Sequence, residues 1–208
     1  MSLLNPATDK FKVAFLGLFD DKNVTEKYDK YLYTRNHPLK TIEEAITETI
    51  VGVNTPGVNL QTTTITGMPN VGSSRPATPS STQMLVPANT SLAEMFESQV
   101  LTIQMRNNIL NYLFFYEAFY ANYLPENSDE YLFFTVVVDI LDSAEIPMMR
   151  FKFGNCFITT MGGMELFTNN GFREAKTLDL GITFNTMDVE IIIPGFKTKT
   201  MSINFKKK

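Results

Sequence analysis

The segment "KTLDLGITFNT" alternates apolar and polar residues with a period of two along residues 176–186. Leu178, Leu180, Ile182 and Phe184 share one parity, and Thr and Asp side chains occupy most of the other. Successive side chains of a strand point to opposite faces, so this pattern predicts a strand with one buried and one polar side. A one-sided strand has to bury its apolar face against a second layer, which favours a sandwich or a barrel.

Further strands are predicted wherever similar alternation or a buried β-branched and aromatic run occurs. Residues 99–106 ("QVLTIQMR") alternate cleanly, and residues 131–141 ("YLFFTVVVDIL") are apolar on both faces. Residues 10–19 and 148–162 read as two more strands, and 189–194 and 199–205 as edge strands. The sequence therefore predicts a sheet-rich chain.

Two helices interrupt these strands. In residues 41–50, Thr41 is a predicted N-cap with Glu44 three positions later, and Ile42 and Ile46 share one helical face. A longer helix begins after Asn107 and Asn108 and ends before Pro125. The longer helix is apolar on most of its circumference, and its expected core residues are Leu110, Leu113, Tyr116 and Phe119. The charged residues 20–40 are expected to form a loop or a frayed surface helix.

The fold class predicted from this order is α+β and mainly β. It is an antiparallel β-sandwich or partial barrel with one long flanking helix and a long hairpin-like loop. The 208 residues suit a single domain spanning 1–208, with an extended neutral loop at 64–87 and a C-terminal segment at 195–208.

Composition argues against several function classes. The net charge is −4 and the pI about 5.1, whereas proteins that grip nucleic acid rely on an excess of Lys and Arg. The single histidine, His37, lies in a charged loop, and the single cysteine, Cys156, lies in an apolar run. No nucleophile elbow, phosphate loop or Cys/His cluster occurs, so we expect no catalysis, no cofactor and no metal.

We also expect a soluble chain made in a reducing cytoplasm. One cysteine cannot form an internal disulfide, and the first ten residues lack the pattern of a signal peptide. No apolar run reaches the length that crosses a bilayer, so no membrane association is predicted.

A long neutral stretch separates the two patterned regions. Between Val53 and Ala93 the only charged side chain is Arg75, and the segment is rich in Thr, Ser, Pro and Gly. Buried at an interface, charged side chains would be costly, whereas hydroxyl and amide groups exchange hydrogen bonds with a partner more cheaply. The stretch therefore reads as an assembly loop, and the alternative is a disordered linker that orders only on assembly.

Four stretches resemble the tail tube proteins of contractile-tailed phages. "VNTPGVNL" is similar to the strand that leads into the hairpin region of that family, and "LTIQMRNNILNYLFFYEAFYANY" resembles its strand followed by a helix, with Asn111, Tyr112 and Tyr116 in the helix signature. "MRFKFGNCFITTMGGMEL" with "TLDLGITFNTMDVEI" is similar to the last strands. The resemblance is one of pattern and covers roughly residues 10–193.

The resemblance implies a structural virion protein. Tube subunits of this family form hexameric rings that stack into the tail, their inner strands join into one β-barrel, and DNA passes through the lumen during infection. The implied partners are other copies of the chain, the tail sheath and baseplate proteins, and DNA transits without specific binding. The implied location is the virion tail, assembled in the host cytoplasm.

Two sets of assembly residues follow from this reading. Residues expected at subunit or ring interfaces are Pro56, Gly57, Thr64, Thr66, Met68, Asn70, Arg75, Pro76, Pro79 and Met84. Residues expected to face the lumen are Thr102, Gln104, Asp179, Thr183 and Asn185. A conduit for DNA should not bind it, and a neutral or weakly acidic lining meets that requirement.

Alternatives remain at this stage. A baseplate protein that initiates the tube, or a tail terminator, would share the same fold. A different class is a ligand-binding β-domain, with carbohydrate as one candidate ligand and Tyr116, Tyr120 and Tyr123 at its site. An enzyme using His37 is the remaining reading.

Overall fold

The structure is a computed structural model that describes residues 10–20, 22–57, 62–66, 83–87, 98–123, 132–163, 177–193 and 195–205. The chain divides into two units, one comprising Met1–Thr55 with Gln99–Lys208 and the other Pro56–Ser98. In chain order the elements are β1 (Phe11–Leu16), α1 (Lys22–Thr34), α2 (Ile42–Thr47), β2 (Ile50–Asn54), β3 (Thr62–Thr66), β4 (Gln83–Pro87), β5 (Val100–Arg106), α3 (Ile109–Tyr123), β6 (Phe134–Leu141), β7 (Pro147–Met161), β8 (Thr177–Thr183), β9 (Thr186–Ile191) and β10 (Lys199–Asn204).

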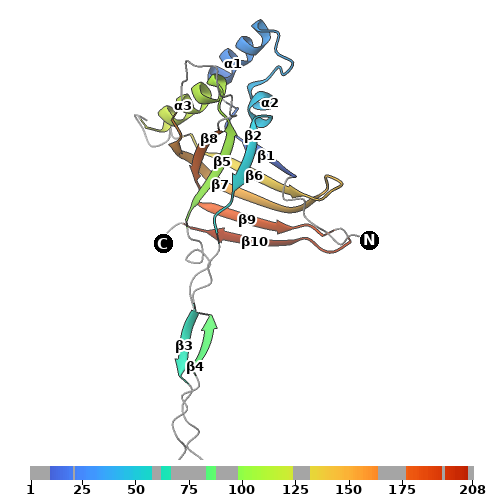
Figure 1. Cartoon of the computed structure of the whole chain (residues 1–208), viewed down its shortest axis with the longest axis vertical. Helices are drawn as coiled ribbons and strands as arrows, with labels where there is room; N and C mark the ends of the chain where they lie inside the picture. The colour runs from blue at the N-terminus through green and yellow to red at the C-terminus, as the bar shows by residue number, and fades with distance from the viewer. Residues whose placement is uncertain are drawn as a thin grey trace, which may run out of the picture. The chain divides into compact units, whose positions relative to one another are not determined.

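The larger unit is built on eight antiparallel strands in which β7 belongs to two sheets (Figure 1). The main path is β1-β6-β7-β8-β5-β2, and β9 pairs with both β7 and β10. The first part of β7, up to Gly154, pairs with β9, and residues 157–161 pair with β8. The mainly β, α+β architecture predicted from the sequence is confirmed.

β7 and the segment that joins β8 to β9 both bend where β7 passes from one sheet to the other. Asn155 has a φ of 50° within the continuous strand β7, and Phe184 with Asn185 separates β8 from β9. The Asn185 amide donates to the Gly154 carbonyl oxygen at 3.1 Å, so the positive-φ residue of β7 and the break between β8 and β9 lie side by side. This shared bend lets the two sheets diverge around one core.

The inward faces are those that alternation predicts. Leu178, Leu180, Ile182 and Phe184 are buried, and so are Leu101, Ile103 and Met105 of β5. Phe153 of β7 meets Phe184 with a ring-centroid distance of 4.8 Å, and Phe184 meets Phe205 at 5.4 Å. Aromatic rings at these separations pack favourably, so they fill the space where the sheets part.

The caps predicted for α2 and α3 are both present. The Thr41 hydroxyl accepts a hydrogen bond from the Glu44 amide at 3.3 Å, and Ile42, Ala45 and Ile46 are buried. The Asn108 side chain accepts from the Asn111 amide at 2.8 Å. Each cap satisfies an N–H group that the helix cannot satisfy itself.

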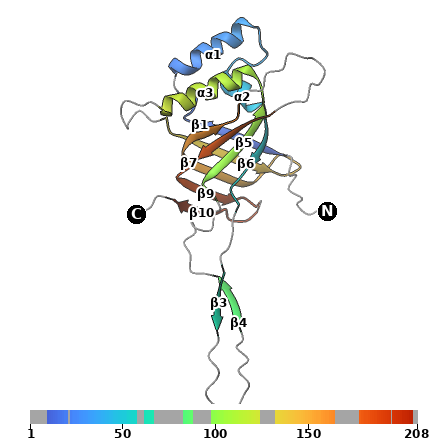
Figure 2. The same cartoon turned by 60° about the vertical axis from the view of Figure 1, so that its left-hand side comes forward.

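Residues 22–34 form a complete helix, α1, rather than a loop or frayed end. Figure 2 shows α1 beside α3, and Lys27 and Tyr28 both bond to Glu117 of α3. Asp29 accepts from the Ile42 amide at 2.6 Å, which joins α1 to the start of α2. These tertiary contacts order a segment that is polar and charged overall.

The prediction that Leu113 and Tyr116 of α3 face the core is wrong, because each residue is 49% exposed. The buried residues of the helix are Asn111, Phe114, Phe115 and Ala118, while Leu110 and Phe119 are half-buried. Phe115 meets Phe15 at 6.1 Å, and Phe114 meets Phe19 at 5.2 Å. The helix is apolar on nearly all sides, so periodicity alone does not select the face that Phe15 and Phe19 cover.

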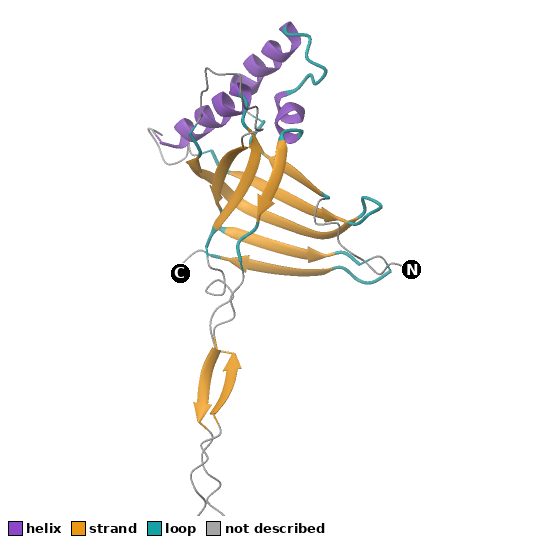
Figure 3. Ribbon diagram, in the orientation of Figure 1, coloured by secondary structure: helices purple, strands orange, loops and turns teal. Residues whose placement is uncertain are grey.

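The smaller unit contains a two-stranded hairpin, β3 and β4, coloured as strands in Figure 3. Five antiparallel pairs run from Thr62 opposite Pro87 to Thr66 opposite Gln83. Of the predicted loop 64–87, residues 64–66 and 83–87 belong to these two strands, and residues 67–82 lie outside the described residues.

Candidate assembly surfaces

Four of the five predicted lumen residues lie on one sheet face. Thr102 of β5 is opposite Gly181 and Gln104 is opposite Asp179 in the β5–β8 register, and Thr183 shares their parity. Residues of the other parity, such as Leu101 and Leu180, are buried. We call Thr102, Gln104, Asp179 and Thr183 the polar face.

The fifth residue, Asn185, lies outside the polar face. It follows β8 at the bend, where its Nδ2 donates to the Asn155 carbonyl oxygen at 3.2 Å. Its role in the structure is to join the two bent strands. The prediction extended the alternation of β8 from Thr183 to Asn185, and it therefore missed this change of direction.

The polar face consists of short side chains that bond to one another or pack on glycine. Thr183 donates to the Thr159 hydroxyl at 3.1 Å, and Thr159 donates to the Gly181 carbonyl oxygen at 3.2 Å. A Cβ on Gly52 would lie 3.0 Å from the Gln104 amide oxygen, so Gly52 gives that side chain its space. Apart from the Asp179 carboxylate, this face offers neutral hydroxyl and amide groups, which do not attract phosphate strongly.

The outer face of the other sheet is charged. The registers align Lys12, Asp139, Arg150 and Glu190 in one row across β1, β6, β7 and β9. Arg150 donates to both oxygens of Asp139, at 2.7 and 3.0 Å, and lies 3.9 Å from Glu190. Its hydrogen bonds to Asp139 raise the pKa of Arg150. Positive and negative residues alternate along this row, and Arg150 pairs with the carboxylates on either side of it.

Sequence reasoning missed this charged row. Arg150 and Lys152 alternate with Phe151 and Phe153, which shows that they share a face. Which residues of β6 and β9 stand opposite them depends on register, and turn lengths in the sequence do not fix it.

The predicted interface residues fall in three places. Pro56 and Gly57 follow β2, Thr64 and Thr66 belong to β3, and Met84 belongs to β4, where it pairs with Ile65. The remaining ones lie outside the described residues: Met68, Asn70, Arg75, Pro76 and Pro79.

The outward side of α3 carries a row of stacked tyrosines. The rings of Tyr112 and Tyr116 are 5.9 Å apart, and those of Tyr116 and Tyr120 are 6.5 Å apart, with interplanar angles of 19° and 16°. Ile109 and Leu113 are exposed beside them. The ring planes of neighbouring tyrosines are nearly parallel, and Tyr116 and Tyr120 are both exposed. The Tyr123 side chain is outside the described residues.

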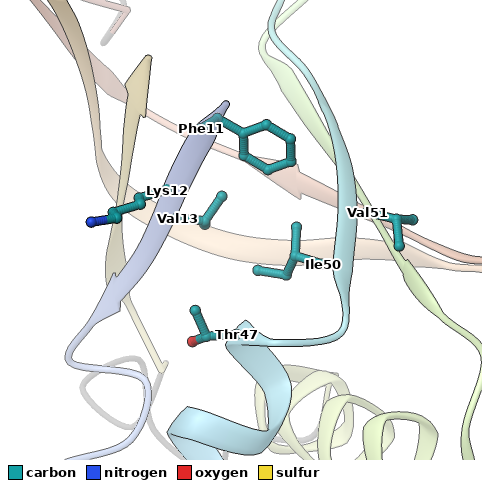
Figure 4. Close-up of a pocket in the computed structure, with 6 residues that line it drawn as sticks. All are labelled: Phe11, Lys12, Val13, Thr47, Ile50 and Val51. Carbon is teal, nitrogen blue, oxygen red and sulfur yellow. The ribbon is translucent and has the colours of Figure 1, made fainter. Parts of the chain in front are cut away.

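A small open pocket lies where the path of strands ends, between β1 and β2 (Figure 4). Its volume is about 280 Å³, and its lining is Phe11, Lys12, Val13, Thr47, Ile50 and Val51. The lining has one charged group and no second polar group suited to catalysis.

His37 and Cys156 are the two residues that the sequence analysis considered for catalysis, and the position of each disfavours that role. His37 is exposed, and its Nδ1 accepts from the Leu39 amide at 3.2 Å. Cys156 is fully buried, its thiol donates to the Phe153 carbonyl oxygen, and burial raises its pKa to about 12. A thiol with that pKa is unreactive at neutral pH.

Within the described parts of the chain, no three His, Cys, Asp or Glu side chains gather as possible ligands of a metal ion. No helix there has both the length and the apolar character needed to cross a bilayer.

Comparisons with known proteins give only distant structural similarities. No family model matches the chain, and no curated protein matches it. Among solved structures, it is similar to Hcp1 from Salmonella typhimurium, with 9% identity, 94% of this chain and 95% of the other covered, and a TM-score of 0.45. A sheath–tube complex of an extracellular contractile injection system gives 8% identity, coverage of 88% and 90%, and a TM-score of 0.47. The tube-terminating cap of the anti-feeding prophage gives 9% identity, coverage of 89% and 90%, and a TM-score of 0.46. Similarity at this level establishes neither a family nor a function.

Proposed function

We propose that the chain is a non-enzymatic structural subunit of a contractile-tail tube, assembled as stacked rings. The observation that carries the proposal is the β3–β4 hairpin. It forms a unit separate from the main sheet, and among the described strands β3 and β4 pair only with each other. An isolated two-stranded hairpin is marginally stable in water, so it needs another surface to complete it. A neighbouring copy supplies that surface in a ring or tube.

The polar face supplies the lining of the channel. Thr102, Gln104 and Thr183 are uncharged, and Asp179 repels phosphate. DNA can move through a channel only if the lining does not bind it tightly. Each phosphate that Lys or Arg neutralises adds to the affinity for DNA. The charged row with Arg150 at its centre suits a surface in contact with water or other proteins.

The location and partners follow from the proposal. Rings of this chain would be hexameric and would belong to a phage tail, with a sheath around the tube and a baseplate at its end. The sequence resemblance to phage tail tube proteins supports this finer reading. A tube initiator or terminator would present the same surfaces and is separated from a tube subunit by how far the rings extend.

Negative-stain electron microscopy of the purified chain across a concentration series tests the proposal. We expect rings that stack into tubes with a central channel. Single rings at every concentration would instead identify an initiator or terminator. Monomers at all concentrations up to millimolar would refute the proposal.

A deletion variant tests whether the hairpin region drives stacking. Removal of Ser73–Ser81 should leave a folded monomer with the wild-type circular dichroism spectrum but few tubes. His37→Ala is the matched control and should assemble like the wild type. Normal tubes from the deletion variant would show that the hairpin region is not an assembly element.

A further inference from the structure

We propose that the outer edge of β10 is the acceptor for the hairpin, and that it pairs with β3 of a second copy of this chain. The inference rests on the proposed function, since it names the partner surface of the assembly hairpin. It requires that the donor hairpin and the acceptor sheet each have one strand with an edge open to a further strand.

On the donor side, β3 is better suited to strand pairing than β4. The sequence of β3 is "TTTIT", which is rich in residues that favour extended structure and has no charge, Gly or Pro. Every residue of β3 has an N–H group. β4 ends in Pro87, which has none, and proline is tolerated mainly at outer edges of sheets. The open edge of β3 is therefore the one that a further strand can extend.

On the acceptor side, β10 is the outermost strand of its sheet (Figure 3). It pairs with β9 over six successive residues, from Lys199 opposite Ile191 to Asn204 opposite Thr186, without a register shift. Among the described strands, none lies on its other side. The edge is straight and long enough to match the five residues of β3.

The hydrogen-bond pattern shows which groups of β10 point outward. The Phe205 amide donates to the Asn185 carbonyl oxygen at 2.9 Å, which makes this a hydrogen-bonded pair in the β9–β10 ladder. Such pairs alternate with non-hydrogen-bonded ones in antiparallel sheets. The backbone groups of Thr200 and Ser202, in the alternate positions, are thus directed away from β9.

The β10 edge also lacks the features that normally block strand addition. It has no proline and no bulge, its one charged residue is Lys199 at the start, and Met201 is exposed. By contrast, β2 has an irregular register between Ile50 and Gly52, and β1 faces the pocket toward β2. β10 is the open edge best formed for a partner strand.

Proline substitution at an outward-facing position tests the acceptor edge. Ser202→Pro removes an outward N–H while leaving the ladder to β9 intact, and Ser202→Ala keeps the N–H as a matched control. We expect Ser202→Pro to keep the wild-type melting curve as a monomer and to lower the yield of tubes by more than about tenfold. Ser202→Ala should assemble normally.

Cross-linking between separate chains tests the contact independently of folding. Thr64→Cys and Ser202→Cys chains, mixed and treated with a short bismaleimide, should give a dimer that neither variant gives alone. The native Cys156 is buried and does not compete. Thr64→Cys mixed with Val51→Cys, at the β2 edge, is the control and should give little product.

The outcomes separate this inference from the proposed function. Wild-type tubes together with normal Ser202→Pro tubes, or a cross-link that forms with Val51→Cys instead, would overturn the β10 assignment and leave the tube function standing. Absence of rings and tubes from the wild-type chain would overturn both.

Discussion

Asn185 donates from Nδ2 to the carbonyl oxygen of Asn155 at 3.2 Å, joining the two points at which the sheet bends. The Asn185 amide also donates to Gly154, and its own carbonyl oxygen accepts from the Phe205 amide. Three chain segments therefore meet at this residue. Their geometry sets how the polar face is oriented relative to β9 and β10.

The backbone of Asn155 provides the first prediction. Its φ of 50° lies in the left-handed region, which costs most L-residues about 1–2 kcal/mol but is less costly for Asn and Gly. We expect Asn155→Ala to lower the free energy of unfolding by about 1 kcal/mol in urea denaturation. Asn155→Gly is the control and should be close to wild type. Equal losses in the two variants would mean that the Asn side chain, not the backbone angle, is what matters.

Asn111 provides the second prediction, because its side chain is fully buried and links three elements. Its Nδ2 donates to the Thr49 hydroxyl at 2.6 Å and to the Arg106 carbonyl oxygen at 3.2 Å. Asn111→Ala removes both hydrogen bonds and leaves part of the buried site empty, and we expect a loss of about 1–3 kcal/mol in the free energy of unfolding.

A double-mutant cycle with Thr49→Val measures the contact itself. We expect a coupling energy of roughly 0.5–1.5 kcal/mol between Asn111 and Thr49. Additive effects of the two substitutions would show that the hydrogen bond contributes little and that packing accounts for the loss.

The contact between α1 and α3 should depend on pH. Burial alone would raise the pKa of Glu117, but hydrogen bonds from Lys27 and Tyr28 and the Lys27 charge outweigh it, so its pKa is lowered from 4.5. A carboxylate with a lowered pKa adds stability above its unfolded pKa, and this stability is lost as the pH falls through the folded value.

Glu117→Gln checks this prediction. At pH 7 the variant should be less stable than wild type by about 0.2–1 kcal/mol, since the pair is partly exposed. The difference should shrink as the pH falls below about 4.5. A difference that stays constant down to pH 3 would exclude a role for the Glu117 charge.

Alternation predicts most of the sheet because it reports which side of a strand is buried. Leu101 and Leu180 face the core as expected, and Thr102 and Asp179 face outward. Alternation carries no information on register, which is why the row through Arg150 and Glu190 appears only in the structure.

Residues whose environment is tertiary were the least predictable. Asn185 follows the alternation of β8 in sequence, but β8 ends at Thr183, and the Asn185 side chain bonds to Asn155 on another strand. The helix α1 has few apolar residues and is ordered by its contacts with Glu117. Such effects come from segments far apart in the chain, so local patterns do not contain them.

The exposed side of α3 gives the last prediction and corrects the expectation that Leu113 is a core residue. Leu113 is 49% exposed, whereas Phe115 is fully buried and packs against Phe15. We expect Leu113→Asp to remain folded, with a loss of no more than about 1 kcal/mol from helix propensity and partial burial. Phe115→Asp should not fold, because it places an unpaired charge and a cavity in the core. Circular dichroism melting curves of the two variants decide the matter: if Leu113→Asp unfolds like Phe115→Asp, the assigned orientation of the helix is wrong.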